Sequence, residues 1–291
     1  MPPGPGFHAG GRPGCRPDLF RGPMHTPPRT GVRAPRGRVT GMLEPSAAPA
    51  RTTMARNASV SVIIPTWNEA KYLPALLDSL QNQTRSPLEI LIADSESTDG
   101  TQDLAEARGA LLVPGDPRGP GEGRNRGARA ARGDVFLFVD ADCITPPDLL
   151  DAIVAAFEEP GVIGGATGFM PALGNAAERA LFSLANGYQR AMTLWGFPHN
   201  AGYCFFFRRE AFQALGGLRE DMPLNETHDL ALRSRSLGRF VILPQAVLTS
   251  MRRFRTYGYV RTILKEYIAS TILYYATGRT SAERFRPAPA R

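Results

Sequence analysis

The segment between residues 59 and 139 alternates short apolar runs with helical patterns, and this alternation limits the possible folds most strongly. Four runs rich in Val, Ile, Leu and Phe have the length of buried strands: 60–64, 89–93, 110–113 and 135–139. After the first run, apolar residues recur three or four positions apart, at 72, 73, 76, 77 and 80, which is the period of an amphipathic helix. Capping residues at 98–101 open a second helix. Strands that alternate with helices form sheets with parallel neighbours, so the sequence predicts an α/β fold.

Composition divides the chain into three segments. The chain has 291 residues and is 43% apolar, enough to bury the core of one large domain. Residues 1–58 are rich in Pro, Gly and Arg and show neither a helical nor a strand period, which predicts a disordered extension. We expect a folded domain over residues 59–251 and a basic amphipathic helical tail over residues 252–291.

The charge distribution argues against a nucleic-acid partner. The formal net charge is +7. Nine Arg residues within 1–58 are opposed there only by Asp18 and Glu44, and this excess equals the charge of the whole chain. Because 252–291 is also basic, segment 59–251 is acidic. Nucleic-acid binding needs a basic face on the folded domain, so we expect no nucleic-acid partner.

Cysteine use and hydropathy suggest an intracellular protein. The three Cys residues lack CxxC spacing, so neither a disulfide framework nor a zinc site is indicated. No apolar run reaches the roughly 18–20 residues of a membrane-spanning helix. We therefore expect the protein in the cytoplasm, and association with the inner face of the membrane is a further possibility.

Two carboxylates follow the fourth apolar run. Asp140 and Asp142 are two residues apart, and residues with this spacing on a strand point to the same side. Such a pair can share one hard cation, Mg²⁺ or Mn²⁺, which proteins commonly hold together with substrate phosphates. The pattern therefore favours a phosphate-ester or diphosphate ligand. The alternative is an ordinary solvated turn after a buried strand.

Polar residues follow three of the predicted strands: Pro65, Thr66, Trp67, Asn68 and Glu69 after the first, Asp94, Ser95 and Glu96 after the second, and Asp140 and Asp142 after the fourth. In open α/β sheets, ligands bind beyond the carboxyl ends of the strands. We therefore expect these groups to converge in one cleft. Taken singly, each could instead be a turn former or a helix cap.

A Gly-rich segment at 119–127 lies before the fourth strand. It does not follow the first strand, as a dinucleotide fingerprint would, and it has no Lys for a phosphate loop of the Walker A kind. Its glycines would let the backbone approach a ligand, and Arg124 would offer phosphate a bidentate fork. A flexible loop is the alternative.

These motifs resemble, in order and spacing, the family 2 glycosyltransferases of the GT-A fold. The resemblance is carried by residues 61–69, 93–101, 123–125 and 140–142, continues through 208–217 and 229–233, and so covers about residues 59–255. It implies a Rossmann-like, mostly parallel sheet flanked by helices, with a C-terminal helical segment.

The same resemblance implies an inverting transfer from a nucleotide-sugar donor, a UDP- or GDP-sugar, assisted by Mg²⁺ or Mn²⁺. The donor-site residues it implies are Pro65, Trp67 and Glu69 at the nucleoside, Asp94 at the base, Arg124 near the base or diphosphate, and Asp140 at the ribose or the metal. Asp142 would be the principal metal ligand.

The catalytic base is where the chain departs from the family pattern. Many relatives have Asp at the position of Thr227. Glu226 and Asp229 are three residues apart and would share one face at the start of a helix running to Leu237. Either could take the acceptor proton, and we prefer Asp229 narrowly. In the alternative interpretation, the acid has a structural role at the start of the helix, where it is stabilised by the helix dipole or by an arginine.

The segment 252–278 interleaves four Arg residues with aromatic and aliphatic ones. This pattern is typical of a basic amphipathic helix, which can lie on an anionic membrane surface. On this interpretation the acceptor would be lipid-linked or a cell-envelope glycan. The alternative is a helix packed against the sheet with Arg at its rim.

Two other functions stay open on sequence grounds. A nucleotidyltransferase that makes a nucleotide sugar would share the sheet and the carboxylates, but it would be expected to carry a Gly-rich loop with a basic residue directly after the first strand. A catalytically silent nucleotide-sugar binding protein is favoured by Thr227. Donor hydrolysis or transfer would separate these possibilities from a glycosyltransferase.

Overall fold

The computed structural model describes residues 57–222 and 224–278. The predicted N-terminal extension therefore lies almost entirely outside the described residues. Eight strands form one sheet: β1 (Val60–Thr66), β2 (Glu89–Asp94), β3 (Leu111–Leu112), β4 (Val135–Val139), β5 (Cys143–Ile144), β6 (Val162–Pro171), β7 (Cys204–Arg208) and β8 (Arg239–Thr249). Their order across the sheet is β3-β2-β1-β4-β7-β6-β8-β5.

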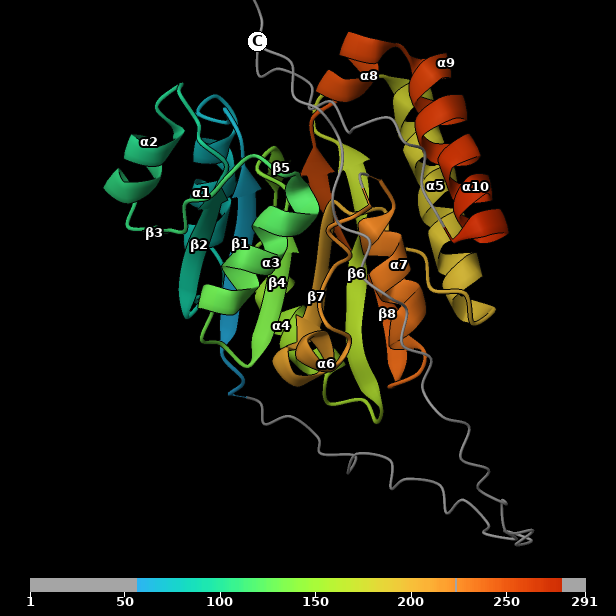
Figure 1. Cartoon of the computed structure of the whole chain (residues 1–291), viewed down its shortest axis with the longest axis horizontal. Helices are drawn as coiled ribbons and strands as arrows, with labels where there is room; N and C mark the ends of the chain where they lie inside the picture. The colour runs from blue at the N-terminus through green and yellow to red at the C-terminus, as the bar shows by residue number, and fades with distance from the viewer. Residues whose placement is uncertain (1–56, 223, 279–291) are drawn as a thin grey trace, which may run out of the picture. The chain divides into compact units, whose positions relative to one another are not determined.

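Eleven helical segments accompany the described part of the sheet (Figure 1). They are α1 (Leu73–Gln81), α2 (Thr101–Ala107), α3 (Pro120–Ala130), α4 (Leu149–Ala156), α5 (Ala176–Leu194), α6 (Arg209–Ala214), α7 (Glu226–Ser234), α8 (Arg252–Tyr257), α9 (Tyr259–Arg261), the π-helix η1 (Thr262–Ala269) and α10 (Ser270–Thr277). The described residues belong to one compact unit.

The N-terminal half of the sheet is parallel, as the alternating pattern predicts. Strand β1 pairs in parallel with both β2 and β4, and β2 pairs in parallel with β3. The apolar strand residues alternate between the two faces, because successive side chains of a strand point in opposite directions. Val62 and Ile64 pack in the core on one face, and Ile63 packs in the core on the other.

The other half makes the sheet mixed. Strand β7 is antiparallel to both β4 and β6, β8 is parallel to β6, and β5 pairs antiparallel with β8. Glycines in β6 allow aromatic side chains to press against the strand. A Cβ atom at Gly164 would lie only 2.5 Å from the ring of Phe207, and one at Gly165 only 2.6 Å from the ring of Phe206.

Two apolar cores cover the faces of the sheet. Helices α1 and α4 contribute Leu and Ile side chains to one core, including Leu76 and Ile153. The other core contains Ala128 of α3, Phe212 of α6 and Leu230 of α7. Burial of this apolar surface is the main force that holds the helices on the sheet.

The Gly-rich segment is helical, which corrects the expectation of a ligand-binding loop. Helix α3 begins at Pro120, and Gly121, Gly123 and Gly127 all lie inside it. A Cβ atom at Gly127 would stand 2.4 Å from a methyl group of Ile63. The missing side chains therefore let α3 approach β1 closely. They fit helix–strand packing rather than a phosphate loop.

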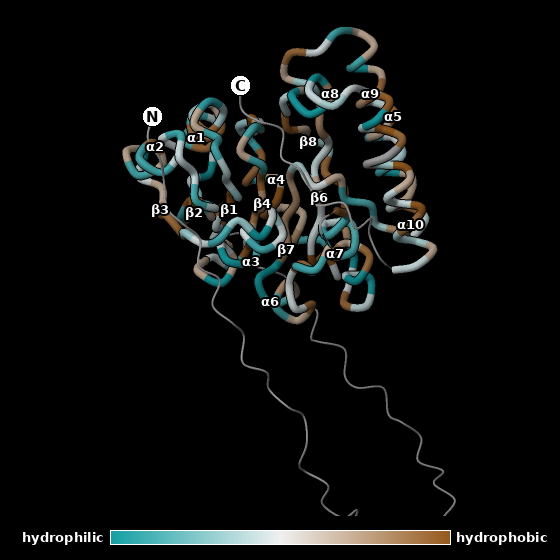
Figure 2. Tube along the Cα trace, turned by 45° about the horizontal axis from the view of Figure 1, so that its top comes forward, coloured by the Kyte–Doolittle hydropathy of each residue, from teal (hydrophilic) through white to brown (hydrophobic). Residues whose placement is uncertain are grey.

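The C-terminal segment packs beside α5. Figures 1 and 2 show α10 running alongside α5 at one side of the sheet, with α8 and α9 at one end of this helical layer. Aromatic contacts join the two, since the rings of Phe182 and Phe254 lie 5.8 Å apart. The hydroxyl groups of Tyr203 and Tyr267 are 3.1 Å apart. Among the described residues, no helix combines the length and the apolar character needed to cross a bilayer.

Candidate active site

A cavity of about 970 Å³ opens beyond the carboxyl ends of β1, β2 and β4 and continues between α5 and the C-terminal helices. The strand ends contribute Pro65, Thr66, Trp67, Glu69, Ser95, Asp140 and Asp142 to its wall. The structure therefore brings the three polar strand ends together, as the rule for open α/β sheets predicts.

Of the predicted site residues, Pro65, Trp67, Glu69, Arg124, Asp140, Asp142 and Glu226 line this cavity, whereas Asp94 and Asp229 are not part of its wall. Trp67 is 42% exposed, so its indole is available to a ligand at the mouth. The charged residues of this set are held by ion pairs between segments far apart in the sequence.

Asp94 lies behind the cavity wall and is fully buried. One of its carboxylate oxygens accepts hydrogen bonds from the hydroxyl groups of Thr66, at 2.8 Å, and Ser97, at 2.6 Å. The other accepts from the backbone N–H of Ser97 and the amide of Gln102, at 2.9 and 2.6 Å. Four donors thus occupy this carboxylate. In this structure Asp94 joins the ends of β1 and β2.

Arg124 links the strand end of β4 to the start of α7. Its guanidinium donates to Asp140 at 2.6 Å and to Glu226 at 2.9 Å, and it lies 3.4 Å from the carbonyl oxygen of Gly202. The side chain is 5% exposed. A buried arginine with two carboxylate partners is a rigid clamp, because the planar fork fixes both acids.

Arg252 is a second clamp, and the sequence did not assign it to the site. Its guanidinium donates to both oxygens of Glu69, at 2.6 and 2.7 Å, and lies 3.1 Å from Asp142. The hydroxyl of Ser250 also donates to Asp142, at 2.6 Å. The sequence feature that could have identified Arg252 is its position just after the strand that became β8, from which a basic side chain can reach the strand ends.

The acids of the cavity wall raise one another's pKa. Burial, reinforced by the charges of Asp142 and Glu226, raises the pKa of Asp140 to about 6 despite Arg124. Burial also raises the pKa of Glu69 to about 7 despite Arg252, with Asp142 and Asp140 adding to the effect. The pKa of Glu226 is raised by burial as well. A concentration of buried negative charge favours binding of a cation.

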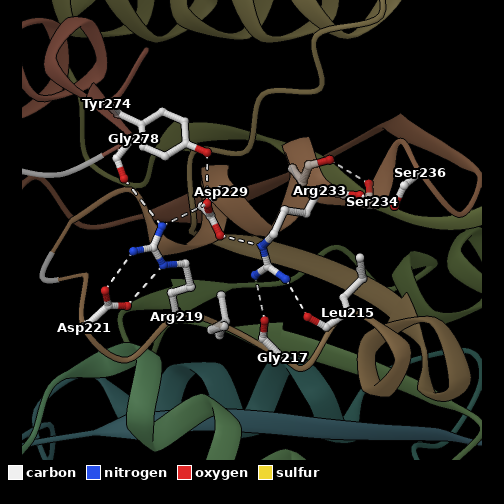
Figure 3. A network of polar contacts seen from close by, with 12 residues as sticks. Leu215, Gly217, Arg219, Asp221, Asp229, Arg233, Ser234, Ser236, Tyr274 and Gly278 are labelled. Atoms are coloured by element: carbon white, nitrogen blue, oxygen red, sulfur yellow. Dashed lines mark hydrogen bonds and ion pairs between the residues drawn. The ribbon is translucent and has the colours of Figure 1, made fainter. Parts of the chain in front are cut away.

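Asp229 belongs to a separate network of polar contacts, which is shown in Figure 3. Its carboxylate accepts from Arg233 at 2.7 Å and from the hydroxyl of Tyr274 at 3.0 Å, and Arg219 lies 3.9 Å away. Arg233 also donates to the backbone carbonyls of Leu215 and Gly217. Glu226 and Asp229 therefore do not present one common face to the cavity. The predicted helix also ends earlier, at Ser234 rather than Leu237.

The carboxylates of Asp140 and Asp142 fit a hard divalent ion. The hydrogen bonds and ion pairs that these two groups make with the described residues fall on one oxygen of each: Oδ1 of Asp140 and Oδ2 of Asp142. No cluster of three or more His, Cys, Asp or Glu side chains suited to a metal occurs within the described ranges. Two carboxylates that require substrate phosphates to complete the coordination suit Mg²⁺ or Mn²⁺.

The far part of the cavity is apolar. Its wall there is built by β6, α5, η1 and α10, with Phe169, Leu181, Leu184, Ala185, Ile263, Ile268 and Ile272. Several of these side chains are also open to solvent, including Leu184 at 73% and Ile272 at 64%. The cavity thus combines a charged end at the sheet with an apolar end between helices.

The structure is similar to solved glycosyltransferases. A mannosyltransferase from Pyrobaculum calidifontis, solved with GDP-Man and Mn²⁺, aligns with a TM-score of 0.55 at 23% identity, covering 77% of this chain and 66% of that one. Glucosyl-3-phosphoglycerate synthase from Mycobacterium tuberculosis aligns with a TM-score of 0.52 at 19% identity, covering 78% and 82%. The fold is that of the GT-A glycosyltransferases.

Sequence comparison gives the family. The model of glycosyl transferase family 2 matches residues 61–216, more than half of the chain, and the chain belongs to this family. Glycosyltransferase AglE of Haloferax volcanii is 34% identical over 131 residues, which are 41% of this chain and 43% of that protein. Poly(ribitol-phosphate) β-N-acetylglucosaminyltransferase TarS of Staphylococcus aureus is 34% identical over 107 residues, 34% and 19% of the two chains. The matched parts thus cover less than half of these relatives.

Proposed function

We propose that the protein is a metal-dependent, inverting glycosyltransferase that moves a sugar from a UDP- or GDP-sugar to an acceptor hydroxyl. The observation that carries this proposal is the group of Glu69, Asp140 and Asp142, held by two arginines at the carboxyl ends of the strands and open to a large cavity. Family membership supports it. So do the solved relatives bound to GDP-Man or UDP-GlcNAc.

In this proposal the donor nucleoside occupies the strand ends of β1 and β2. Pro65, Trp67 and Glu69 line that part of the cavity, and the exposed indole of Trp67 could cover one face of a base. We had predicted that Asp94 touches the base. Its four internal hydrogen bonds support a different contribution, in which it fixes the ends of β1 and β2 around the nucleoside.

Asp142 and Asp140 are the proposed metal ligands. An ion bound there would neutralise the negative charge of the departing diphosphate. Arg252 lies against Asp142 and balances its charge. Arg124 holds Asp140 in place, which keeps the carboxylate directed toward the diphosphate.

Glu226 is the better-placed of the two proposed bases. It lines the cavity, whereas Asp229 is outside the wall and paired with Arg233. In the transfer step, the acceptor oxygen bonds to the anomeric carbon as the bond from that carbon to the diphosphate oxygen breaks. The acceptor proton passes to the Glu226 carboxylate, and the diphosphate leaves with the bonding electrons. The raised pKa of Glu226 suits proton acceptance at neutral pH.

The apolar end of the cavity supports a lipid-linked acceptor. Four side chains at intervals of four residues form an exposed stripe along α9, η1 and α10: Val260, Leu264, Ile268 and Ile272, which are 71%, 56%, 47% and 64% exposed. Ile268 and Ile272 also line the cavity. An acceptor with its hydroxyl at Glu226 would extend its remaining part along this wall.

The same segment supports contact with a membrane. Besides Arg252, which is paired within the site, residues 252–278 contain Arg253, Arg255, Arg261 and Lys265 against the single acid Glu266. Basic residues beside an exposed apolar stripe favour binding to an anionic lipid surface. We therefore propose a protein of the cytoplasm that associates with the inner face of the membrane, where such an acceptor would be presented.

One observation favours a second candidate, a catalytically silent nucleotide-sugar binding protein. Thr227 replaces the usual acid, and Glu226 is held by Arg124. Incubation of the full chain with UDP-glucose, UDP-GlcNAc and GDP-mannose in the presence of Mn²⁺ separates the two. We expect release of UDP or GDP, reduced at least 100-fold in Asp142→Asn. Donor binding without any release would favour the silent protein.

A further inference from the structure

A group of polar residues between the two ends of the cavity is not used by the chemistry described above. His199, Asn200 and His228 all line the cavity. Each has one buried polar atom without a hydrogen-bond partner among the described residues: Nδ1 of His199, Nδ2 of Asn200 and Nδ1 of His228. A buried polar atom left unpaired costs about 1–3 kcal/mol. Three such atoms in neighbouring residues indicate a place prepared for a polar ligand.

The fold holds these side chains through their other atoms. Nε2 of His228 lies 3.0 Å from the hydroxyl of Tyr275, and Oδ1 of Asn200 accepts from the backbone N–H of Gly202 at 2.9 Å. The rings of His199 and His228 lie 4.4 Å apart. Asn200 and His228 are only 4% and 2% exposed. Hydrogen bonds thus fix Asn200 and His228, ring contacts with Tyr188 and His228 hold His199, and all three keep an unused hydrogen-bonding atom.

The electrostatics of this group suit a neutral ligand. Burial lowers the pKa of His199 to about 3 and that of His228 to about 4, so both rings are uncharged at neutral pH. A neutral imidazole and a carboxamide bind hydroxyl groups, and they offer no charge to a phosphate.

The group also lies beside the reaction centre. Asn200 and Gly202 belong to the loop whose Gly202 carbonyl lies 3.4 Å from Arg124. Gly202 has a φ of 91°, and a Cβ there would come within 3.2 Å of the Thr227 hydroxyl. This close approach brings the loop against the start of α7, where Glu226 faces the cavity. A ring bound by the group would therefore be next to the proposed base and the Arg124 clamp.

We propose that His199, Asn200 and His228 form a subsite that binds the hydroxyl groups of a sugar ring. The inference rests on the proposed function and adds which residues select the sugar. The ring belongs either to the donor or to a glycosylated acceptor, and both have the same hydrogen-bonding chemistry. If the ring belongs to the donor, the subsite controls donor binding. If it belongs to the acceptor, the subsite controls acceptor binding.

The test compares nucleoside diphosphate with nucleotide sugar. Calorimetric titration of the full chain, with Mn²⁺, gives the ratio of the Kd for UDP or GDP to that for the corresponding sugar nucleotide. In Asn200→Ser and His199→Phe we expect Kd for the nucleotide within twofold of wild type and a ratio reduced about 5-fold, since each lost hydrogen bond contributes about 1 kcal/mol. Asn82→Ser, at an exposed position outside the cavity wall, is the matched control and should leave the ratio unchanged.

Each outcome has a distinct meaning. An unchanged ratio together with a raised KM for the acceptor would assign the subsite to an acceptor ring and keep the inference. An unchanged ratio with an unchanged acceptor KM would overturn it. Nucleotides that do not bind wild type would contradict the proposed function itself. If a variant does not fold, histidine ring signals in NMR spectra of wild type decide. A shift with sugar nucleotide but not with nucleotide alone, or a shift with a methyl glycoside, would support the subsite, and no shift with either sugar compound would overturn it.

Discussion

Arg252 donates two hydrogen bonds to the carboxylate of Glu69, across 183 residues of sequence. This ion pair connects the first residue of α8 to the segment that follows β1. The same guanidinium lies 3.1 Å from Asp142. A single side chain from the C-terminal segment thus neutralises two acids of the candidate donor site.

Replacement of Arg252 should expose the repulsion between these acids. We expect Arg252→Gln to lower the free energy of unfolding by about 2–4 kcal/mol, because loss of one partner leaves buried carboxylates without their counter-charge. Mn²⁺ should then stabilise the variant more than it stabilises wild type. Urea unfolding with and without Mn²⁺ measures both effects. An equal Mn²⁺ increment in the two proteins would mean that Arg252 does not balance the metal-binding acids.

The sequence predicted the parallel half of the sheet because its strands carry a local signal. The runs that became β1, β2, β3 and β4 are short, apolar and bounded by turn residues, and the observed strands lie within a residue or two of the predicted ones. Strand β7 also follows a helix, α5, so its antiparallel direction could not be predicted from the alternation of strands and helices. Its position between β4 and β6 depends on packing of Phe205, Phe206 and Phe207 with residues distant in sequence.

Glu226 and Asp229 should differ in what their loss affects. Glu226→Gln should reduce kcat by 10²–10⁴-fold, the usual contribution of a general base, with donor affinity close to wild type. Asp229→Asn should mainly lower the free energy of unfolding, by about 1–3 kcal/mol, because the substitution removes the negative charge that pairs with Arg233. Steady-state kinetics and urea unfolding of both variants distinguish the two. The reverse pattern would indicate that Asp229 is the catalytic base.

Site residues were predictable where they follow strands and less so where they come from the tail. Asp140 and Asp142 could be found from their spacing, and the structure places both at the cavity. Arg252 and Asn200 lie on segments whose approach to the sheet is set by tertiary packing. The preference for Asp229 rested on helical periodicity. That period could not show that Tyr274 and Arg233 enclose its carboxylate.

The two buried histidines should make stability depend on pH. Their pKa values in the folded protein, about 3 for His199 and about 4 for His228, lie below the unfolded value of about 6.5. The unfolded state therefore binds more protons as pH falls below 6.5, and stability is lost in that direction. The raised pKa values of Glu69 and Asp140, about 7 and about 6, act in the opposite direction over this range. The contribution of the histidines is therefore the difference between wild type and the double variant His199→Asn with His228→Gln in urea unfolding at pH 7.5 and 5.5. The double variant should be more stable at pH 5.5, relative to pH 7.5, than wild type is, and an equal change in both proteins would contradict a contribution of the histidines.

The exposed stripe on the C-terminal helices should mediate vesicle binding. We expect the full chain to float with vesicles containing anionic lipid and to be released by high salt, which screens the basic residues. Leu264→Ser with Ile268→Ser should reduce the bound fraction several-fold. Leu88→Ser is the matched control, since Leu88 is 50% exposed but precedes β2, which lies next to the edge strand β3 and not in the C-terminal helices. Equal loss in both would show that the stripe has no special role.

The most direct test of the donor site is thermal stabilisation of the full chain by UDP, GDP and their sugars, with and without Mn²⁺. A ligand that binds only the folded state raises Tm. We predict a Mn²⁺-dependent rise with one of the two nucleotides, abolished in Asp142→Asn, whose fold should persist because the substitution keeps the side-chain shape. Stabilisation by no nucleotide, or a rise of equal size in the variant, would contradict a metal-assisted nucleotide-sugar site at Asp140 and Asp142.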